Sequence, residues 1–225
     1  MENNNNAKDK TLRHHINGAE ITKEKNLWQV FKLAKKITTS FLHRVICSLS
    51  AALLFINIFF VDKNINHAIS DIRTWSSFGF NFTITTLGFL IAGFTIFATL
   101  SKPEMMIAMM LHKNKEAQIP TLKYNFMAFM KVFIIFISCS FIYLFVMLFG
   151  QTNGMAGNIT RLLPHSDLIK KYGVMAIYVL VGTSLVHLLL TIKTFIYNIY
   201  AIVMTSIRWE YEKSAQSEIN EQENK

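Results

Sequence analysis

The chain has 225 residues, of which 52% are hydrophobic and only 16% are charged. The charged share lies well below the roughly 25% of an average soluble protein, which excludes an ordinary water-exposed globular surface. Lys and Arg outnumber Asp and Glu, giving a formal net charge of +9, but the charges gather between long apolar runs. We therefore expect no direct nucleic-acid binding, although the same excess in a soluble protein would suggest it.

The N-terminal segment is polar at first and then becomes amphipathic. Residues 1–20 include four consecutive asparagines and are expected to be a disordered cytosolic tail. Residues 21–44 repeat apolar side chains at helical spacing with lysines on the other side, which predicts a basic amphipathic juxtamembrane helix on the inner leaflet. This helix is interpreted as a topology anchor or as a contact for a partner or anionic lipid, through Trp28, Phe31, Lys32, Lys35 and Lys36.

Four apolar runs follow, each near the length of about 20 residues that crosses a bilayer as a helix. Such long, uniform runs are typical of helices, because a helix satisfies its own backbone groups in lipid. The sequence therefore predicts an all-α membrane protein with four transmembrane helices. Cys47 and Cys139 lie inside the runs and are interpreted as small packing residues, with no metal expected. The spans cover about 45–61, 78–100, 129–149 and 172–193, within a transmembrane domain of 45–207.

Lys and Arg are distributed unequally on the two sides of these spans. The N-terminal segment has nine of them, the second loop five and the C-terminal tail four, whereas the first and third loops have two and three. Segments rich in Lys and Arg stay on the cytosolic side of a membrane. We therefore expect a multi-pass protein of the bacterial inner membrane with both termini in the cytosol (N-in/C-in).

The second loop begins with Ser101 and Glu104 at the spacing of a capping box. A short helix through about His112 is expected to follow, with Met105 and Met109 on one face. A methionine face packs beneath neighbouring helices or adapts to a partner. Both interpretations stay open at this stage.

The remaining connections differ in character. Ile65, Ile69, Ile72 and Trp75 recur at helical spacing, which predicts a short helix in the outer interface. Residues 150–171 contain Gly, Asn and a proline and are expected to be irregular. The acidic tail, residues 208–225, is expected to extend the fourth helix into the cytosol and then fray. It is interpreted as a solvated end or as a contact for a basic partner or for the basic N-terminal helix.

The second span has a face of small residues at steps of three and four. This period is typical of close helix packing, either inside one chain or between copies in a homo-oligomer. The alternative is a pore lining. We call this face the small-residue seam; it consists of Asn81, Thr85, Gly88, Ala92, Thr95 and Thr99.

The fourth span has a polar stripe at similar steps. Its titratable member, His187, should face protein or water and is a functional hypothesis by default. It is interpreted as a neutral packing residue or as part of a gate, proton sensor or ion path. The polar stripe consists of Thr183, His187, Thr191, Thr194 and Asn198.

The sequence has no catalytic motif: HExxH, a phosphate-binding loop and GxSxG are all missing. The four spans contain no Asp or Glu, which argues against a cation- or proton-coupled transporter. We therefore expect neither an enzyme nor a cofactor. An oligomeric ion channel or pore-forming protein stays open as an alternative function.

The segment TLGFLIAGFTIFATL (residues 86–100) runs directly into SKPE (residues 101–104). With the four-span plan and the basic lead, this segment resembles the KwaA family, the membrane subunits of the Kiwa anti-phage defence system. The resemblance implies a homo-oligomeric membrane sensor that detects phage infection at the inner membrane and recruits a cytosolic DNA-binding effector, KwaB. It implies no catalytic residue.

Overall fold

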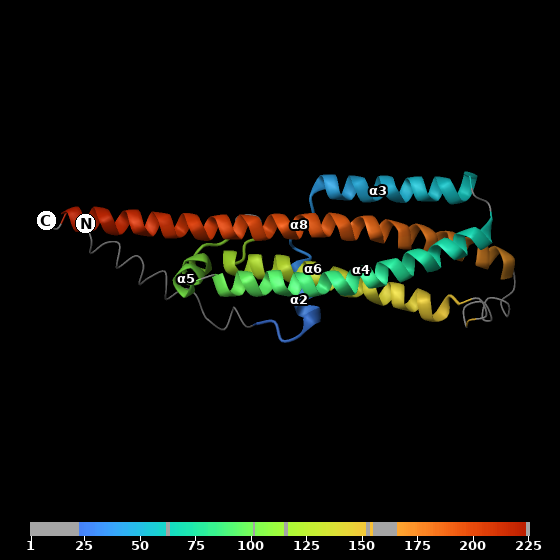
Figure 1. Ribbon diagram of the computed structural model, residues 1–225, viewed down its shortest axis with the longest axis horizontal. Coiled ribbons are helices and arrows are strands. Elements are labelled where there is room, and N and C mark those ends of the chain that lie inside the picture. Colours follow the sequence, from blue (N-terminus) through green and yellow to red (C-terminus); the bar gives the residue numbers. More distant parts are fainter. Residues whose placement is uncertain are drawn as a thin grey trace. The chain divides into compact units, whose positions relative to one another are not determined.

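The computed structural model describes residues 23–61, 64–100, 102–114, 117–151, 154 and 166–223. The expected disordered tail, residues 1–20, lies outside this range. Within it the regular structure is helical, and one isolated β-bridge joins Lys113 to Pro120. The elements are α2 (Leu27–Ala34), α3 (Phe41–Ile56), the π-helical turn η2 (Asn57–Val61), α4 (Ile65–Leu100), α5 (Pro103–Leu111), α6 (Thr121–Phe149) and α8 (Ser166–Glu223), shown in Figure 1.

Four of the described helices are long and apolar enough to cross a membrane. Each exceeds the about 20 residues that a hydrocarbon core requires. The predicted all-α fold with four transmembrane helices is therefore confirmed. The four candidate spans are Phe41–Val61, Ile65–Thr99, Thr121–Phe149 and Asp167–Gln222.

Two helices extend into segments that were predicted to be a separate helix or irregular. The segment expected to form a separate interfacial helix, residues 65–75, is the beginning of α4, because no proline interrupts the chain up to Leu100. The end of the third loop is likewise helical, since α8 already begins at Ser166. As expected, α8 continues through most of the acidic tail and ends at Glu223. The predictions of a separate helix at residues 65–75 and of irregular structure at residues 166–171 were therefore wrong.

The juxtamembrane helix is shorter than the expected segment of residues 21–44. Helix α2 begins after Asn26, whose side-chain Oδ1 accepts a hydrogen bond from the Gln29 amide at 2.9 Å. Such a cap satisfies one of the free amides at a helix start. Helix α2 ends at Ala34, and the chain starts a new helix, α3, at Phe41.

The chain packs as two compact units. The first, which we call the histidine unit, comprises Thr39–Ile91 and Val132–Thr194. The second, the phenylalanine unit, comprises the described residues up to Thr38, then Ala92–Lys131 and the described residues from Phe195 onward. Helices α4, α6 and α8 each contribute residues to both units.

The core of the histidine unit lies where α4, α6 and α8 meet. The Tyr143 ring of α6 is fully buried against Gly79 of α4, where an added Cβ would lie 2.7 Å from the ring. One turn after Gly79 in α4 and one turn before Tyr143 in α6, Ser140 donates a hydrogen bond to Thr83 across 2.7 Å. A glycine and a hydroxyl pair thus let α4 and α6 approach closely, as small residues do in membrane helices.

Aromatic rings form the core of the phenylalanine unit. Phe129 of α6 has no exposed surface, and its ring centroid lies 5.1 to 5.9 Å from those of Phe94, Phe97 and Phe195. Aromatic pairs at this separation attract one another beyond simple burial. These rings hold α4, α6 and α8 together within this unit.

Two lysines of α6 hold the N-terminal segment in the phenylalanine unit. Lys123 forms an ion pair with Glu24 at 2.8 Å, and both side chains are largely buried. The Lys131 ammonium donates to the backbone carbonyl of Ile37, also at 2.8 Å. Helix α2 is therefore fixed to α6 on both flanks.

Candidate functional site

The polar stripe of α8 meets two polar side chains of α3 in the histidine unit. His43 Nε2 lies 2.7 Å from His187 Nδ1, and the two rings contact edge to face with centroids 4.8 Å apart. At this distance one neutral ring donates and the other accepts, depending on the tautomers. Among the residues of α3, all of which the structure describes, His43 is the only buried one.

Cys47 joins this pair from the next turn of α3. Its Sγ lies 3.8 Å from His187 Nδ1. His43 and Cys47 are four residues apart on one helix, so they share a face. The donor atoms of His43, Cys47 and His187 all lie within 4.8 Å of one another. We call these three residues the His–Cys cluster.

A groove of about 500 Å³ lies beside the His–Cys cluster. Thr183, one turn before His187, lines this groove, and its Oγ1 is buried with no hydrogen-bond partner among the described residues. The rest of the lining is mostly apolar. The lining residues are Cys47, Ala51, Ala176, Val179, Leu180, Thr183, Ser184 and His187.

The structure divides the predicted polar stripe. Thr191 is 3% exposed and donates to the His187 carbonyl, so with Thr183 and His187 it belongs to the part turned toward protein. Thr194 is exposed and donates to its own helix at Leu190, whereas Asn198 is half-buried and belongs to the phenylalanine unit. Thr191 is thus packed inside the chain, whereas Thr183 and His187 also line the groove.

Further neutral polar pairs surround the site in the histidine unit. The Tyr143 hydroxyl lies 2.7 Å from the Ser184 hydroxyl, which borders the groove. The Asn57 amide, in η2, donates to the Tyr178 hydroxyl at 3.1 Å. Such pairs satisfy polar groups where a charge would be costly.

The small-residue seam of α4 is not covered by the rest of the described chain. Its six members are all exposed, and a Cβ added at Gly88 would have no neighbour within 4 Å. The buried face of α4 is a different row, which includes Ser76, Gly79 and Thr83. Of the two packing interpretations of the seam, contact inside one chain is therefore not found.

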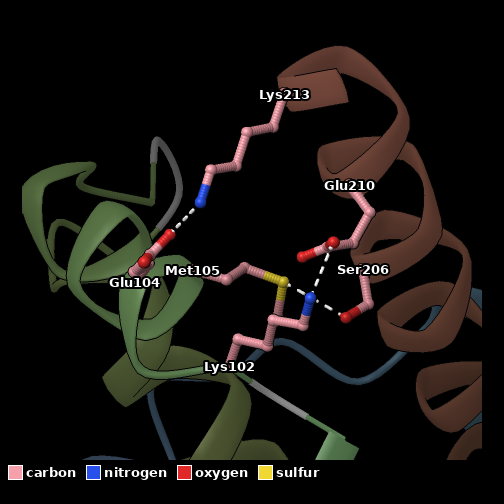
Figure 2. A network of polar contacts seen from close by, with 6 residues as sticks. All are labelled: Lys102, Glu104, Met105, Ser206, Glu210 and Lys213. Carbon is pink, nitrogen blue, oxygen red and sulfur yellow. Dashed lines mark hydrogen bonds and ion pairs between the residues drawn. The ribbon is translucent and has the colours of Figure 1, made fainter. Parts of the chain in front are cut away.

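In the phenylalanine unit, charged side chains link α5 to α8 (Figure 2). Lys102 pairs with Glu210 at 2.8 Å, and Glu104 pairs with Lys213. The hydrogen bond and charge of Lys213 lower the pKa of Glu104, and Glu104 in turn raises the pKa of Lys213. These four side chains are exposed, so water and salt reach them.

The predicted partner contacts have different surroundings in the phenylalanine unit. Met105 is 2% exposed, and its sulfur accepts from the Ser206 hydroxyl at 3.3 Å, so it packs within the chain (Figure 2). The half-buried Met109 accepts from Asn125. The methionine face is thus used for packing, and Met105 is not presented to a partner.

The basic residues of the N-terminal segment remain accessible. Trp28 is 61% exposed, with the Lys32 ammonium 5.8 Å from its ring centroid. Phe31 is half-buried beneath Lys35, whose ammonium lies 4.7 Å from its ring centroid. Lys32, Lys35 and Lys36 are all exposed. This surface suits contact with anionic groups.

The sequence interpretation missed the His–Cys cluster. It treated His187 and Cys47 separately and assigned no role to His43. The available signal was the spacing of His43 and Cys47, four residues apart at the start of an apolar run. Only the packing of α3 against α8 brings His187 to that pair.

Comparison with known proteins identified no relative of this chain. No protein-family model, curated protein or solved structure matches the chain.

Proposed function

We propose that this chain is a sensor and assembly subunit of a bacterial anti-phage defence system, similar to the KwaA family. It would lie in the inner membrane with both termini in the cytosol. There it would detect phage infection and recruit a cytosolic DNA-binding effector of the KwaB type. No catalytic step by the chain itself is part of this proposal.

The observation that carries the proposal is the polar, ion-paired part of the phenylalanine unit. Helix α8 has 58 residues, whereas a membrane crossing needs about 20. Its last turns pair with α5 through Glu210 and Lys213, which gives α5 and α8 a charged, exposed common surface. Charged rims of this kind guide the approach of a protein partner.

Two further features support the same function. The exposed Trp28 and lysines of the N-terminal segment suit the anionic inner leaflet, where each nearby lysine contributes roughly 1 kcal/mol. The excess of Lys and Arg in the termini and second loop supports a cytosolic location for them.

The exposed small-residue seam supports a homo-oligomer. Exposed Gly88 and its small neighbours permit close approach of a second helix in the membrane. Gly88→Val should lower the oligomeric mass measured by light scattering in mild detergent. An unchanged mass would remove the seam from the subunit contact.

The defence role is tested in cells that carry this gene together with a gene for an effector of the KwaB type. Ending the chain after Arg208 removes Glu210 and Lys213 but keeps residues 166–208 of α8, more than the about 20 that a membrane crossing needs. The shortened chain should still enter the membrane. The efficiency of phage plating should rise, and the membrane fraction should contain less of the effector. A chain ending after Glu218 keeps both α5 contacts and serves as the control. Protection that persists in the chain ending after Arg208 would contradict the proposal.

A further inference from the structure

The His–Cys cluster brings three potential metal ligands from two helices to one point. His43 Nε2 and Cys47 Sγ come from α3, and His187 Nδ1 comes from α8. We propose that these three side chains bind a d¹⁰ transition-metal cation, Zn²⁺ or Cu⁺. This inference does not depend on the defence role, because it concerns the binding of the metal alone.

The donor set selects this class of metal. Two imidazole nitrogens and one sulfur suit Zn²⁺ and Cu⁺, whereas Ca²⁺ and Mg²⁺ require oxygen ligands. A helix that offers ligands at positions i and i+4 presents both on one face, with a third ligand from a neighbouring element. His43, Cys47 and His187 have this arrangement.

The distances between the donor atoms are close to those of a metal site. Tetrahedral zinc with bonds of about 2.0–2.1 Å to nitrogen and about 2.3 Å to sulfur places two nitrogens about 3.4 Å apart and nitrogen and sulfur about 3.6 Å apart. The His187–Cys47 separation is 3.8 Å, already near that value. The His43–His187 separation is 2.7 Å, so metal binding must replace their hydrogen bond and part the nitrogens by roughly 0.7 Å. Rotation of the two imidazoles about their side-chain bonds would supply this movement.

The groove supplies an approach and a fourth position. Cys47 and His187 both line it, so a cation entering the groove meets the sulfur and one imidazole directly. Thr183 lines the same groove with a buried hydroxyl that lacks a hydrogen-bond partner in the described part of the chain. A hydroxyl there, or a water held by it, can complete a four-coordinate shell.

The proposed metal would act on the least buried span. Helix α3 contributes one buried residue, and that residue is the ligand His43. A metal shared by His43, Cys47 and His187 would therefore fix α3 to α8 at this end. Metal binding to the folded chain also stabilises it, because the unfolded chain lacks the arranged site.

The first experiment measures metal binding by the full chain. The protein is purified in detergent micelles, freed of metal with a chelator, kept reduced, and titrated separately with Zn²⁺ and Cu⁺ against a coloured chelator. We expect at least one of the two ions to bind at one per chain. Absence of binding by both ions would overturn the proposal.

Matched variants assign the ligands. H43Q, C47S and H187Q should each weaken binding about tenfold or more, since loss of groups that only support a ligand already costs 10–100-fold. C139S and H67Q change the same residue types elsewhere in the spans and should bind like the unaltered chain. Equal binding by all five variants would overturn the assignment.

A measurement on the unaltered chain removes the risk that a variant misfolds. Co²⁺ is added in place of zinc, and the absorption spectrum is recorded. A thiolate-to-cobalt charge-transfer band with tetrahedral ligand-field bands supports the site. Ligand-field bands of bound Co²⁺ without the charge-transfer band would exclude Cys47 as a ligand.

Discussion

The polar contacts inside the histidine unit differ in kind from those inside the phenylalanine unit. In the histidine unit, uncharged pairs join the helices: His43 with His187, Thr83 with Ser140, and Tyr143 with Ser184. In the phenylalanine unit, a cluster of rings is accompanied by Lys–Glu pairs such as Lys102–Glu210 and Lys123–Glu24.

This difference reflects the surroundings in which each kind of contact is stable, hydrocarbon or water. A neutral hydroxyl pair costs little to bury in hydrocarbon, whereas a charge at that depth is expensive even when paired. Exposed ion pairs such as Lys102–Glu210, by contrast, are screened by water and salt and contribute little stability. We therefore expect the rings, more than the exposed ion pairs, to stabilise the phenylalanine unit.

The largest expected effect is in the ring cluster. Phe129→Ala removes a fully buried ring between Phe94, Phe97 and Phe195 and should lower the free energy of unfolding by about 3–5 kcal/mol. Unfolding by SDS in mixed micelles measures this change. Phe145→Ala, at a ring that is 60% exposed, is the control and should cost far less. Equal losses would mean that burial in the ring cluster does not stabilise the unit.

A smaller loss is expected at the close approach of α4 and α6. Gly79→Val would force a side chain against the Tyr143 ring and should cost about 1–3 kcal/mol. Gly88→Val makes the same change on the same helix where no atom lies within 4 Å. In a detergent that keeps the chain monomeric, SDS unfolding should separate the two variants. If Gly88→Val were the more destabilising, the assignment of the buried face of α4 would be wrong.

Neutral hydrogen bonds should have a still smaller effect. Tyr143→Phe removes the contact with Ser184 but keeps the buried ring, and membrane hydrogen bonds of this kind contribute about 0.6 kcal/mol. A double-mutant cycle with Ser184→Ala isolates the pair, because Ser184 also donates to its own helix. A coupling energy near zero would show that the pair adds nothing to ring packing.

The smallest effect is expected at the exposed pair of Glu104 and Lys213. The lowered pKa of Glu104 means that the pair contributes above the usual Glu pKa, and that the contribution is lost as the pH falls through the lowered value. The raised pKa of Lys213 places the other limit at high pH. E104Q should slightly lower the melting temperature near neutral pH and at low salt, and the swapped variant E104K/K213E should recover it. A loss that persists in high salt would point to a cause other than charge.

Hydropathy predicted the number of spans, but it could not choose the buried face of α4. Two rows of small residues run along this helix at steps of three and four. One is the predicted seam with Gly88, and the other contains Ser76, Gly79 and Thr83. Periodicity is the same for both rows, so only the position of Tyr143 shows which one packs inside the chain.

Helix ends and contacts between distant segments could not be predicted from the sequence either. Asp71 and Arg73 lower the hydropathy before the second span, although nothing there breaks a helix, so α4 began earlier than predicted. His43 and Cys47 are near in sequence, but 140 residues separate Cys47 from His187. No local pattern predicts a contact over such a separation, because it depends on how the helices pack.

The π-helical turn η2 has a consequence for bilayer thickness. A π turn contains an extra residue relative to an α turn, because its hydrogen bonds run from i to i+5. Deleting one residue in Asn57–Val61 would change the geometry of the first crossing at its far end, while His43 and Cys47, which precede this turn, would keep their orientation. Hydrophobic matching to a thinner or thicker membrane and the geometry of the His–Cys cluster are therefore separable properties of this helix.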